Sequence, residues 1–328
     1  MKIRGGIILK PNVYLTLPVP EEVRKYIAEY CEIREWTGDG PIPRERLMKE
    51  IADVEGLYTS GGKIDGKLLD HAPKLKVVSN MSVGYNNFDV EAMKARNVIG
   101  TNTPYVLDNT VADLTFALIL SAARRIAELD HLVKDGQWEP MKDEEAFFGV
   151  DVHNKTIGII GMGRIGEAIA KRAKFGFEMD VLYYNRSRKL EAEEKYGATY
   201  CDLESLLQKS DFVVLMTPLT PETYQLIGEN EFDLMKESAI FINVSRGQTV
   251  DENALIHALQ DNKIYGAGLD VFEKEPVDKD NPLLAMKNVV TVPHIGSATR
   301  QTRDAMAMRA AENLVAVVTG KAAIDPVY

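Results

Sequence analysis

The sequence predicts an α/β protein whose second half forms a doubly wound parallel sheet. Short apolar runs alternate with amphipathic runs along most of the chain, as in repeated βαβ units. A glycine-rich turn separates the first apolar run of the second half from a helical pattern. The chain has 328 residues, and at roughly 150 residues per domain this length favours two domains.

The first hundred residues alternate strand-like and helix-like segments. We expect strands at 13–15, 54–58, 75–79 and 98–99, and helices at 21–30, 67–71 and 91–96. From residue 108 to about 134, neither proline nor glycine interrupts the chain, and apolar side chains spread around more than one helical face. This pattern predicts one helix that is buried on several sides. An irregular, partly acidic connection that contains Trp138 is expected to follow it, over residues 137–151.

The second half repeats the βα pattern more regularly. We expect strands at 156–160, 181–184, 212–216, 239–243, 265–269 and 289–292. The helices expected after and between them lie at 164–175, 189–196, 203–208, 229–235, 253–260 and 298–318. Strands that alternate with helices in this way are typical of a doubly wound sheet.

The composition limits the classes of function. Hydrophobic residues make up 45% of the chain, and the formal net charge of −10 opposes binding to nucleic acid. The apolar stretch 114–123 is about half of the ~20 residues that a membrane span needs, and the apolar part of residues 1–11 is too short for a signal peptide. Cys31 and Cys201 lie far apart, which fits neither a disulfide framework nor a thiolate metal site. We therefore expect a cytoplasmic protein.

The glycine-rich turn has the spacing of a dinucleotide-binding loop. It comprises Gly161, Met162, Gly163, Arg164, Ile165 and Gly166 and lies between a predicted strand and a predicted helix. The first glycine permits the tight turn, the second lets backbone amides approach a pyrophosphate, and the third allows close packing of helix and strand. The alternative is a glycine-rich turn that binds no ligand.

The end of the next strand indicates which dinucleotide is bound. An acidic residue there would bind the ribose 2′-hydroxyl of NAD, but this position is Asn185, followed by Arg186, Ser187 and Arg188. Asp180 precedes the predicted strand and is expected at the opposite edge of the sheet. Guanidinium groups suit a 2′-phosphate, so NADP is favoured and NAD remains possible. The alternative is that the arginines are solvated side chains at a helix start.

Two residues at strand ends are candidates for catalysis. Arg246 follows an apolar strand, and its planar guanidinium matches the oxygens of a keto acid. His294 directly follows another apolar strand and is the candidate general acid that protonates a carbonyl oxygen as hydride arrives. A neighbouring carboxylate would favour the charged ring; Glu273, Glu275 and Asp278 all qualify, and spacing alone leaves the choice open. The chain shows no pattern of metal ligands.

Four motifs in order resemble those of the D-isomer-specific 2-hydroxyacid dehydrogenases. They occupy residues 161–166, 243–247, 268–276 and 293–299. Within this family, residues 80–89 and 184–188 are most similar to glyoxylate/hydroxypyruvate reductases and 2-ketogluconate reductases. The resemblance implies reduction of glyoxylate, hydroxypyruvate or 2-ketogluconate to the D-2-hydroxy acid.

The resemblance also assigns roles to particular residues. It selects Glu275 as the partner of His294, because the family carboxylate precedes a proline. Substrate would be bound by Val83, Gly84, Arg246, His294 and Ser297. Beyond the glycine loop and residues 185–188, the cofactor site would include Thr217, Pro218, Val244, Asp270 and Gly296. Asn86 stands where the family usually has aspartate, which is expected to alter the loop without abolishing binding.

The family fold implies a discontinuous arrangement. Residues 1–101 and 297–328 would form a flavodoxin-like substrate domain, and 102–296 an inserted Rossmann-type dinucleotide-binding domain. A homodimer is implied, in which Trp138 reaches the neighbouring active site or packs on its own subunit. The alternatives are a dinucleotide-sensing corepressor, which keeps the same residues, and other dehydrogenases of this fold. Of these, formate dehydrogenases carry glutamine in place of Glu275, phosphite dehydrogenases remain possible, and the end of the chain at residue 328 disfavours a phosphoglycerate dehydrogenase with a regulatory domain.

Overall fold

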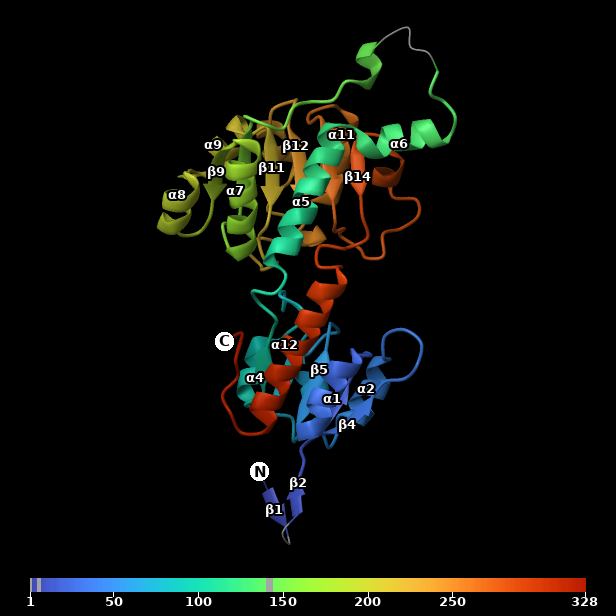
Figure 1. Cartoon of the computed structure of the whole chain (residues 1–328), viewed down its shortest axis with the longest axis vertical. Helices are drawn as coiled ribbons and strands as arrows, with labels where there is room; N and C mark the ends of the chain where they lie inside the picture. The colour runs from blue at the N-terminus through green and yellow to red at the C-terminus, as the bar shows by residue number, and fades with distance from the viewer. Residues whose placement is uncertain (1, 5–6, 140–143) are drawn as a thin grey trace. The chain divides into compact units, whose positions relative to one another are not determined.

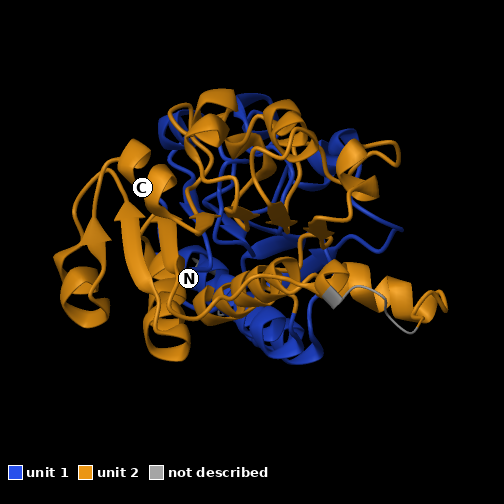
Figure 2. Cartoon of the chain, turned by 90° about the horizontal axis from the view of Figure 1, so that it is seen from above, with its two compact units in different colours: residues 1–107, 299–328 blue, residues 108–298 orange. Residues whose placement is uncertain are grey.

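The computed structural model of the protein describes residues 2–4, 7–139 and 144–328. The chain divides into two units: Met1–Leu107 with Thr299–Tyr328 form unit 1, and Asp108–Ala298 form unit 2 (Figure 2). The divisions fall where helices begin, whereas the expected ones lie at 101/102 and 296/297.

Unit 2 contains a seven-stranded parallel sheet in the order β10-β9-β8-β11-β12-β13-β14 (Figure 1). Its strands are β8 (Thr156–Ile160), β9 (Asp180–Tyr184), β10 (Thr199–Tyr200), β11 (Phe212–Leu215), β12 (Ile240–Asn243), β13 (Gly266–Leu269) and β14 (Val289–Thr291). The chain runs outward from β8 to β10 and then returns to place β11 on the other side of β8. This is the Rossmann strand order with one further strand, and its topological switch point lies between β8 and β11.

Helices cover the sheet of unit 2. They are α5 (Asp108–Ala123), α6 (Ile126–Lys134), α7 (Arg164–Phe177), α8 (Leu190–Tyr196), α9 (Leu203–Lys209), α10 (Glu229–Leu234) and α11 (Glu252–Gln260), with short 3-10 turns η1 (Glu144–Phe147), η2 (Gly247–Thr249) and η3 (Pro282–Ala285). A Cβ on Gly268 would lie 3.0 Å from the Cβ of Leu118, so α5 packs directly on β13. Side chains of α9, α10 and α11 join those of the strands in one apolar core.

Two expectations for unit 2 were wrong. The sheet has a further strand, β10, which escaped notice because it is only two residues long and both are exposed. The single helix expected at 108–134 is two helices, because Arg125 takes a left-handed conformation with φ 56°. In that conformation the Arg125 guanidinium binds Glu128 through Nε and Nη2 and donates to the carbonyl oxygens of Ala146 and Phe148.

Unit 1 is built on a five-stranded parallel sheet in the flavodoxin-like order β4-β3-β5-β6-β7. Its strands are β3 (Asn12–Leu15), β4 (Glu32–Glu35), β5 (Gly56–Thr59), β6 (Val77–Asn80) and β7 (Ile99–Thr101), and a separate hairpin joins β1 (Lys2–Arg4) and β2 (Ile7–Leu9). Its helices are α1 (Glu21–Tyr30), α2 (Arg44–Glu50), α3 (Gly66–Leu69), α4 (Val90–Ala95) and α12 (Arg300–Val318). The sequence patterns missed β4 and α2. The strand lies at a sheet edge and has no buried residue, so it carries no apolar run.

The last helix, α12, forms part of the core of unit 1. A Cβ on Gly56 would lie 2.7 Å from the Leu314 side chain, so glycine allows α12 to approach β5. Buried polar groups also join helix and sheet, since Tyr58 donates to the Ala307 carbonyl at 3.1 Å and Ser79 to the Ala310 carbonyl at 2.7 Å. Part of the covering of this sheet, beside that of α1, therefore comes from a segment far along the chain.

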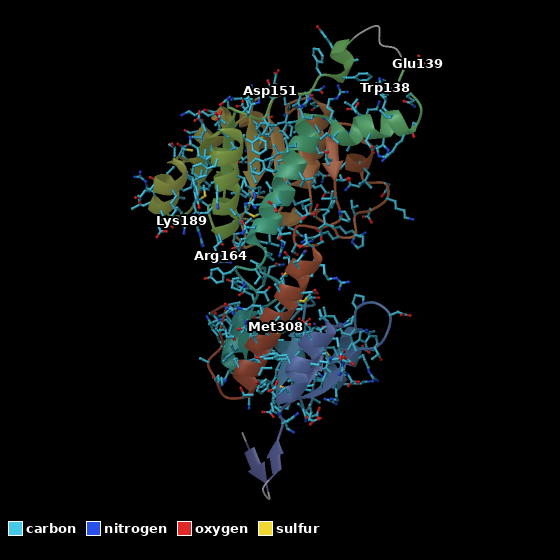
Figure 3. The ribbon with its side chains drawn as sticks, in the orientation of Figure 1. Trp138, Glu139, Asp151, Arg164, Lys189 and Met308 are labelled. Atoms are coloured by element: carbon cyan, nitrogen blue, oxygen red, sulfur yellow. The ribbon has the colours of Figure 1, made fainter. Side chains whose placement is uncertain are left out.

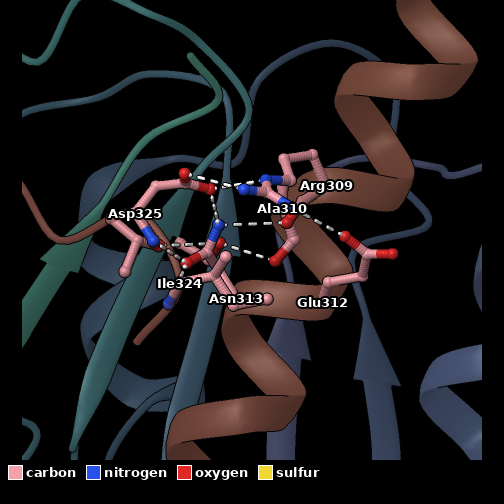
Figure 4. Close-up of polar contacts among 8 residues, drawn as sticks. Arg309, Ala310, Glu312, Asn313, Ile324 and Asp325 are labelled. Atoms are coloured by element: carbon pink, nitrogen blue, oxygen red, sulfur yellow. Dashed lines mark hydrogen bonds and ion pairs between the residues drawn. The ribbon is translucent and has the colours of Figure 1, made fainter. Parts of the chain in front are cut away.

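Hydrogen bonds and an ion pair join the C-terminal tail to α12 (Figure 4). The buried carboxylate of Asp325 accepts hydrogen bonds from Arg309 Nε at 2.6 Å and from Asn313 Nδ2 at 2.8 Å. In return, Asn313 Oδ1 accepts the Asp325 backbone N–H at 2.8 Å. The tail then continues along β7, where the Val327 N–H donates to the Gly100 carbonyl.

Candidate active site

The predicted site residues of unit 2 follow the carboxyl ends of its strands. The last residues of neighbouring strands are in register, with Ile160 beside Leu215, Leu215 beside Asn243, and Asn243 beside Leu269. The loops that follow therefore emerge at one edge of the sheet, which is where ligands bind in such folds. These loops carry Gly161–Gly166, Asn185–Arg188, Thr217, Pro218, Val244, Arg246, Asp270, Glu275, His294, Gly296 and Ser297. Val83 and Gly84 lie in unit 1, after β6.

The glycine loop has the geometry that its sequence indicates. Gly161 has φ 107°, and a Cβ there would lie 2.6 Å from the Met216 carbonyl oxygen. A Cβ on Gly166 would lie 2.4 Å from the Gly161 carbonyl, so both positions require glycine. At Gly163, by contrast, a Cβ would meet nothing within 4 Å. The loop therefore leaves open space beside its second glycine, where a pyrophosphate could approach.

Two further observations fit a dinucleotide at this edge. Helix α7 begins directly after Gly163 without a side-chain cap, and the N-terminus of a helix is a place where anions bind. Thr217 follows β11 on the other side of the switch point, and its buried Oγ1 has no hydrogen-bond partner among the described residues. Residues present at the edge thus fit a dinucleotide.

The two arginines that follow β9 differ in their hydrogen-bonding partners. Arg186 is exposed and makes no hydrogen bond or ion pair with any residue that the structure describes. Arg188 instead binds both carboxylate oxygens of Glu193, at 2.8 Å each. Glu193 also accepts a hydrogen bond from Tyr183 at 2.7 Å. Sequence reasoning missed this anchor, since Glu193 is one acidic residue among several in α8.

Arg246 is held by the turn that follows β12. Its carbonyl oxygen accepts hydrogen bonds from Asn243 Nδ2 at 3.1 Å and Thr249 Oγ1 at 2.6 Å, while its Nη1 donates to the Ser245 carbonyl at 2.7 Å. Asn243 belongs to the motif at 243–247, but the sequence assigned it no role. Its position as a buried polar residue at the end of an apolar strand was the available signal.

Gly247 brings this turn against the loop after β13. A Cβ at Gly247 would lie only 1.8 Å from the Phe272 carbonyl oxygen, a distance that no side chain permits. The same contact is reinforced by Gln248, whose Nε2 donates to the Glu273 carbonyl at 2.6 Å. The backbone approach thus places the loop that contains Glu275 beside the turn that contains Arg246.

His294 forms a hydrogen-bonded pair with Glu275. His294 Nδ1 lies 2.7 Å from Glu275 Oε2, and the other carboxylate oxygen accepts the Phe272 N–H at 3.1 Å. The remaining ring nitrogen, Nε2, makes no hydrogen bond among the described residues. Of the other two candidates, Asp278 binds Lys274 at 2.5 Å, and no hydrogen bond or ion pair joins Glu273 to the imidazole in the described structure.

Asp270 shapes the turn that carries His294. Its carboxylate accepts the Ile295 N–H at 2.6 Å and the Gly296 N–H at 2.9 Å, and its carbonyl accepts the His294 N–H at 2.9 Å. These bonds hold His294 in a left-handed conformation with φ 52°. A carboxylate has about four acceptor positions, so Asp270 keeps the capacity to bind a further donor.

The electrostatics of the site favour a charged Glu275. Burial pushes its pKa up, but the hydrogen bond and charge of His294, the Phe272 N–H and the charge of Arg246 together hold the pKa below its ordinary value. Burial raises the pKa of Asp270, against the hydrogen bonds of the Ile295 turn. Burial also lowers the pKa of Arg246, although arginine remains protonated in proteins. The site thus combines a carboxylate with a permanent cation.

No group of three His, Cys, Asp or Glu side chains in the described part of the chain is arranged to hold a metal ion. None of its helices has the length and apolar character needed to cross a membrane.

The fold and this edge define a dinucleotide-dependent oxidoreductase. Comparison with known proteins is more specific: a family model described as D-isomer specific 2-hydroxyacid dehydrogenase, NAD binding domain, matches residues 116–296. The chain therefore belongs to the D-isomer-specific 2-hydroxyacid dehydrogenases, which confirms the resemblance noted in the sequence.

Individual relatives span almost the whole chain. Glyoxylate/hydroxypyruvate reductase B of Escherichia coli (strain SMS-3-5 / SECEC) is 50% identical over 313 residues, covering 95% of this chain and 96% of that protein. A crystal structure of a protein from Thermus thermophilus has a TM-score of 0.88 and 40% identity, covering 97% of this chain and 100% of that one. An NADPH-dependent glyoxylate/hydroxypyruvate reductase from Sinorhizobium meliloti, in complex with NADP and malonate, has a TM-score of 0.85 and 32% identity, covering 97% of each chain.

Proposed function

We propose that the protein reduces a small 2-keto acid, namely glyoxylate, hydroxypyruvate or 2-ketogluconate, to the D-2-hydroxy acid. The observation that carries this proposal is the His294–Glu275 pair, 2.7 Å long, in the loops that follow β13 and β14. When bound, the nicotinamide cofactor supplies the hydride. In this proposal unit 2 is the dinucleotide-binding domain and unit 1 the substrate domain.

The described contacts support a role for each side chain. Because Nδ1 of His294 is bonded to Glu275, Nε2 is the ring nitrogen that can transfer a proton to the substrate oxygen. The hydrogen bond to Glu275 fixes the orientation of the ring. Arg246 offers a guanidinium to the carboxylate and carbonyl of the substrate, and the backbone amides of Val83 and Gly84 donate to the carboxylate. Ser297 completes the proposed substrate set.

A substrate panel tests this function. Purified protein is assayed with glyoxylate, hydroxypyruvate and 2-ketogluconate, each with NADPH and with NADH, and we expect steady turnover of at least one keto acid. Phosphite and 3-phosphoglycerate serve as the panel for other dehydrogenases of this fold. Dinucleotide binding without turnover of any keto acid would contradict the proposal and favour a corepressor-like binding scaffold.

We also propose a preference for NADPH that depends mainly on Arg186. Arg188 would have to give up part of its bidentate pair with Glu193 to bind a 2′-phosphate, whereas Arg186 has no such competitor among the described residues. Arg186→Ala should weaken NADPH binding by roughly tenfold or more, as for the loss of one charge-assisted contact. Arg188→Ala should have a smaller effect.

Direct titration of each variant with NADPH and NADH checks this expectation, because the affinity for NADH should hardly change. Equal weakening of both cofactors, or a native preference for NADH, would remove the arginines from 2′-phosphate recognition. The roles proposed for Asn185, Ser187, Pro218 and Val244 in the cofactor site are smaller, because none of them carries a charge.

A homodimer formed through α6 is proposed as the quaternary structure. No residue of α6 is buried, although Ile126 and Val133 are apolar and more than half exposed, and Trp138 beyond it is 68% exposed (Figure 3). A second copy is the proposed cover for this apolar surface. Light scattering should give twice the chain mass for the native protein and the monomer mass for an Ile126→Lys, Val133→Glu variant. A native monomer would contradict the proposal. It would also exclude the role in which Trp138 reaches the active site of the partner subunit.

A cytoplasmic location is part of the same proposal. It is supported by Cys31 and Cys201, which are both free thiols, as a reducing compartment would keep them.

A further inference from the structure

The loop that follows β6 carries two carbonyl groups that are bound by asparagine side chains. Asn102 Nδ2 donates to the Val83 carbonyl oxygen at 2.8 Å, and Asn80 Nδ2 donates to the Gly84 carbonyl oxygen at 2.9 Å. Asn80 is the last residue of β6, and Asn102 directly follows β7, the neighbouring strand. Both donors therefore lie at the carboxyl ends of neighbouring strands, next to the loop.

These bonds determine where the next N–H groups point. In a planar trans peptide, the C=O of one residue and the N–H of the next point in opposite directions. A fixed Val83 carbonyl thus fixes the direction of the Gly84 N–H, and a fixed Gly84 carbonyl fixes that of the Tyr85 N–H. Neither N–H has an acceptor among the described residues of the protein.

The peptide before them is fixed in the same way. The Thr103 N–H donates to the Ser82 carbonyl at 3.0 Å, which directs the Val83 N–H, and this N–H also lacks an acceptor within the described chain. Within the described structure, three consecutive N–H groups are thus unpaired, and the carbonyls of their three peptides are bonded. Successive unpaired amides of this kind form a site that favours an anion.

We propose that Asn102 and Asn80 are positioning residues that aim the N–H groups of Gly84 and Tyr85 at the substrate carboxylate. Tyr85 thereby becomes a third amide donor, beside those of Val83 and Gly84. The inference rests on the proposed function, because it takes the substrate to be a carboxylate.

The burial of Asn80 supports a task beyond filling space. Its side chain is 1% exposed, and its Oδ1 is buried without a hydrogen-bond partner in the described structure. A buried amide oxygen without a partner is unfavourable, and a leucine of similar size would avoid that cost. The contribution that remains specific to asparagine is the bond to the Gly84 carbonyl.

The test compares Asn102→Leu with Asn87→Leu. Asn87 is the matched control, because its Nδ2 also donates to a backbone carbonyl of unit 1, that of Gly62 at 3.0 Å, but not to one of the three peptides. Malonate is titrated by calorimetry in the presence of the cofactor, and KM and kcat are measured with the best keto acid. Asn102→Leu should weaken malonate and raise KM by roughly tenfold, as for one hydrogen bond to a charged group, with a smaller change in kcat. NADPH affinity should stay unchanged.

The outcomes separate this inference from the proposed function. Equal malonate affinity and KM in Asn102→Leu and the native protein would overturn the positioning role, as would an equal loss in Asn87→Leu. A native protein that does not bind malonate would overturn the anion site itself. Failure of the proposed function appears differently, as absence of keto-acid turnover in the native protein. Asn80→Leu should also weaken malonate binding and raise KM. If this variant does not fold because Asn80 is buried, Asn102→Leu still tests the inference.

Discussion

Replacement of His294 by Ala is expected to lower kcat by about two to four orders of magnitude, the usual contribution of a general acid. The variant lacks the imidazole whose Nε2 is proposed to donate the proton. The glycine loop proposed to bind the cofactor is unchanged. Steady-state kinetics measure the loss, and fluorescence titration should show NADPH binding close to that of the native protein.

His257→Ala is the matched control for this experiment. His257 is an exposed residue of α11, outside the loops that carry the proposed site, and its loss should leave kcat unchanged. Near-normal turnover in the His294 variant would remove this residue from the mechanism.

Arg246→Lys is expected to lower kcat/KM by roughly two orders of magnitude, with KM rising and kcat falling together. Lysine keeps the charge but lacks the planar guanidinium, which can bind a carboxylate and a neighbouring carbonyl oxygen at once. Initial rates over a range of keto-acid concentrations separate the two effects.

Arg172→Lys controls for the general effect of such a change. Arg172 binds Asp113 on α5 and takes no part in the proposed chemistry. Its replacement should leave both parameters near their native values. Unchanged kinetics in Arg246→Lys would mean that Arg246 is structural.

Much of the architecture could be predicted because buried parallel strands are continuous apolar runs. Strands such as β8 and β12 are fully or almost fully buried, and their apolar sequences stand out from the helices around them. Arg246 and His294 were identified from the same runs, since each lies just after a strand, whereas the choice of Glu275 and most of the substrate set came from the family resemblance. The strands that were missed in the two parallel sheets lie at edges: β4 and β10 have no buried residue to mark them.

The local sequence pattern could not decide which of several neighbouring carboxylates pairs with His294. Glu273 and Glu275 are two residues apart, and the contacts that distinguish them, such as the bond of Glu275 to His294 and the approach of Gly247 to the Phe272 carbonyl, come from other segments. The break between α5 and α6 depends on carbonyl groups twenty or more residues further along the chain, which bind Arg125. Both features are tertiary contacts that no window of sequence contains.

The place of α12 has a consequence for the order in which the protein can fold during synthesis. Domains usually fold in the order in which they leave the ribosome. Here the sheet of unit 1 is made first, yet the helix that packs on β5 and the tail anchored by Asp325 are made last. Unit 2 is continuous and has all its residues once Ala298 has emerged. The nascent chain therefore carries one face of this sheet only partly covered, by α1, until Thr299–Tyr328 have been made.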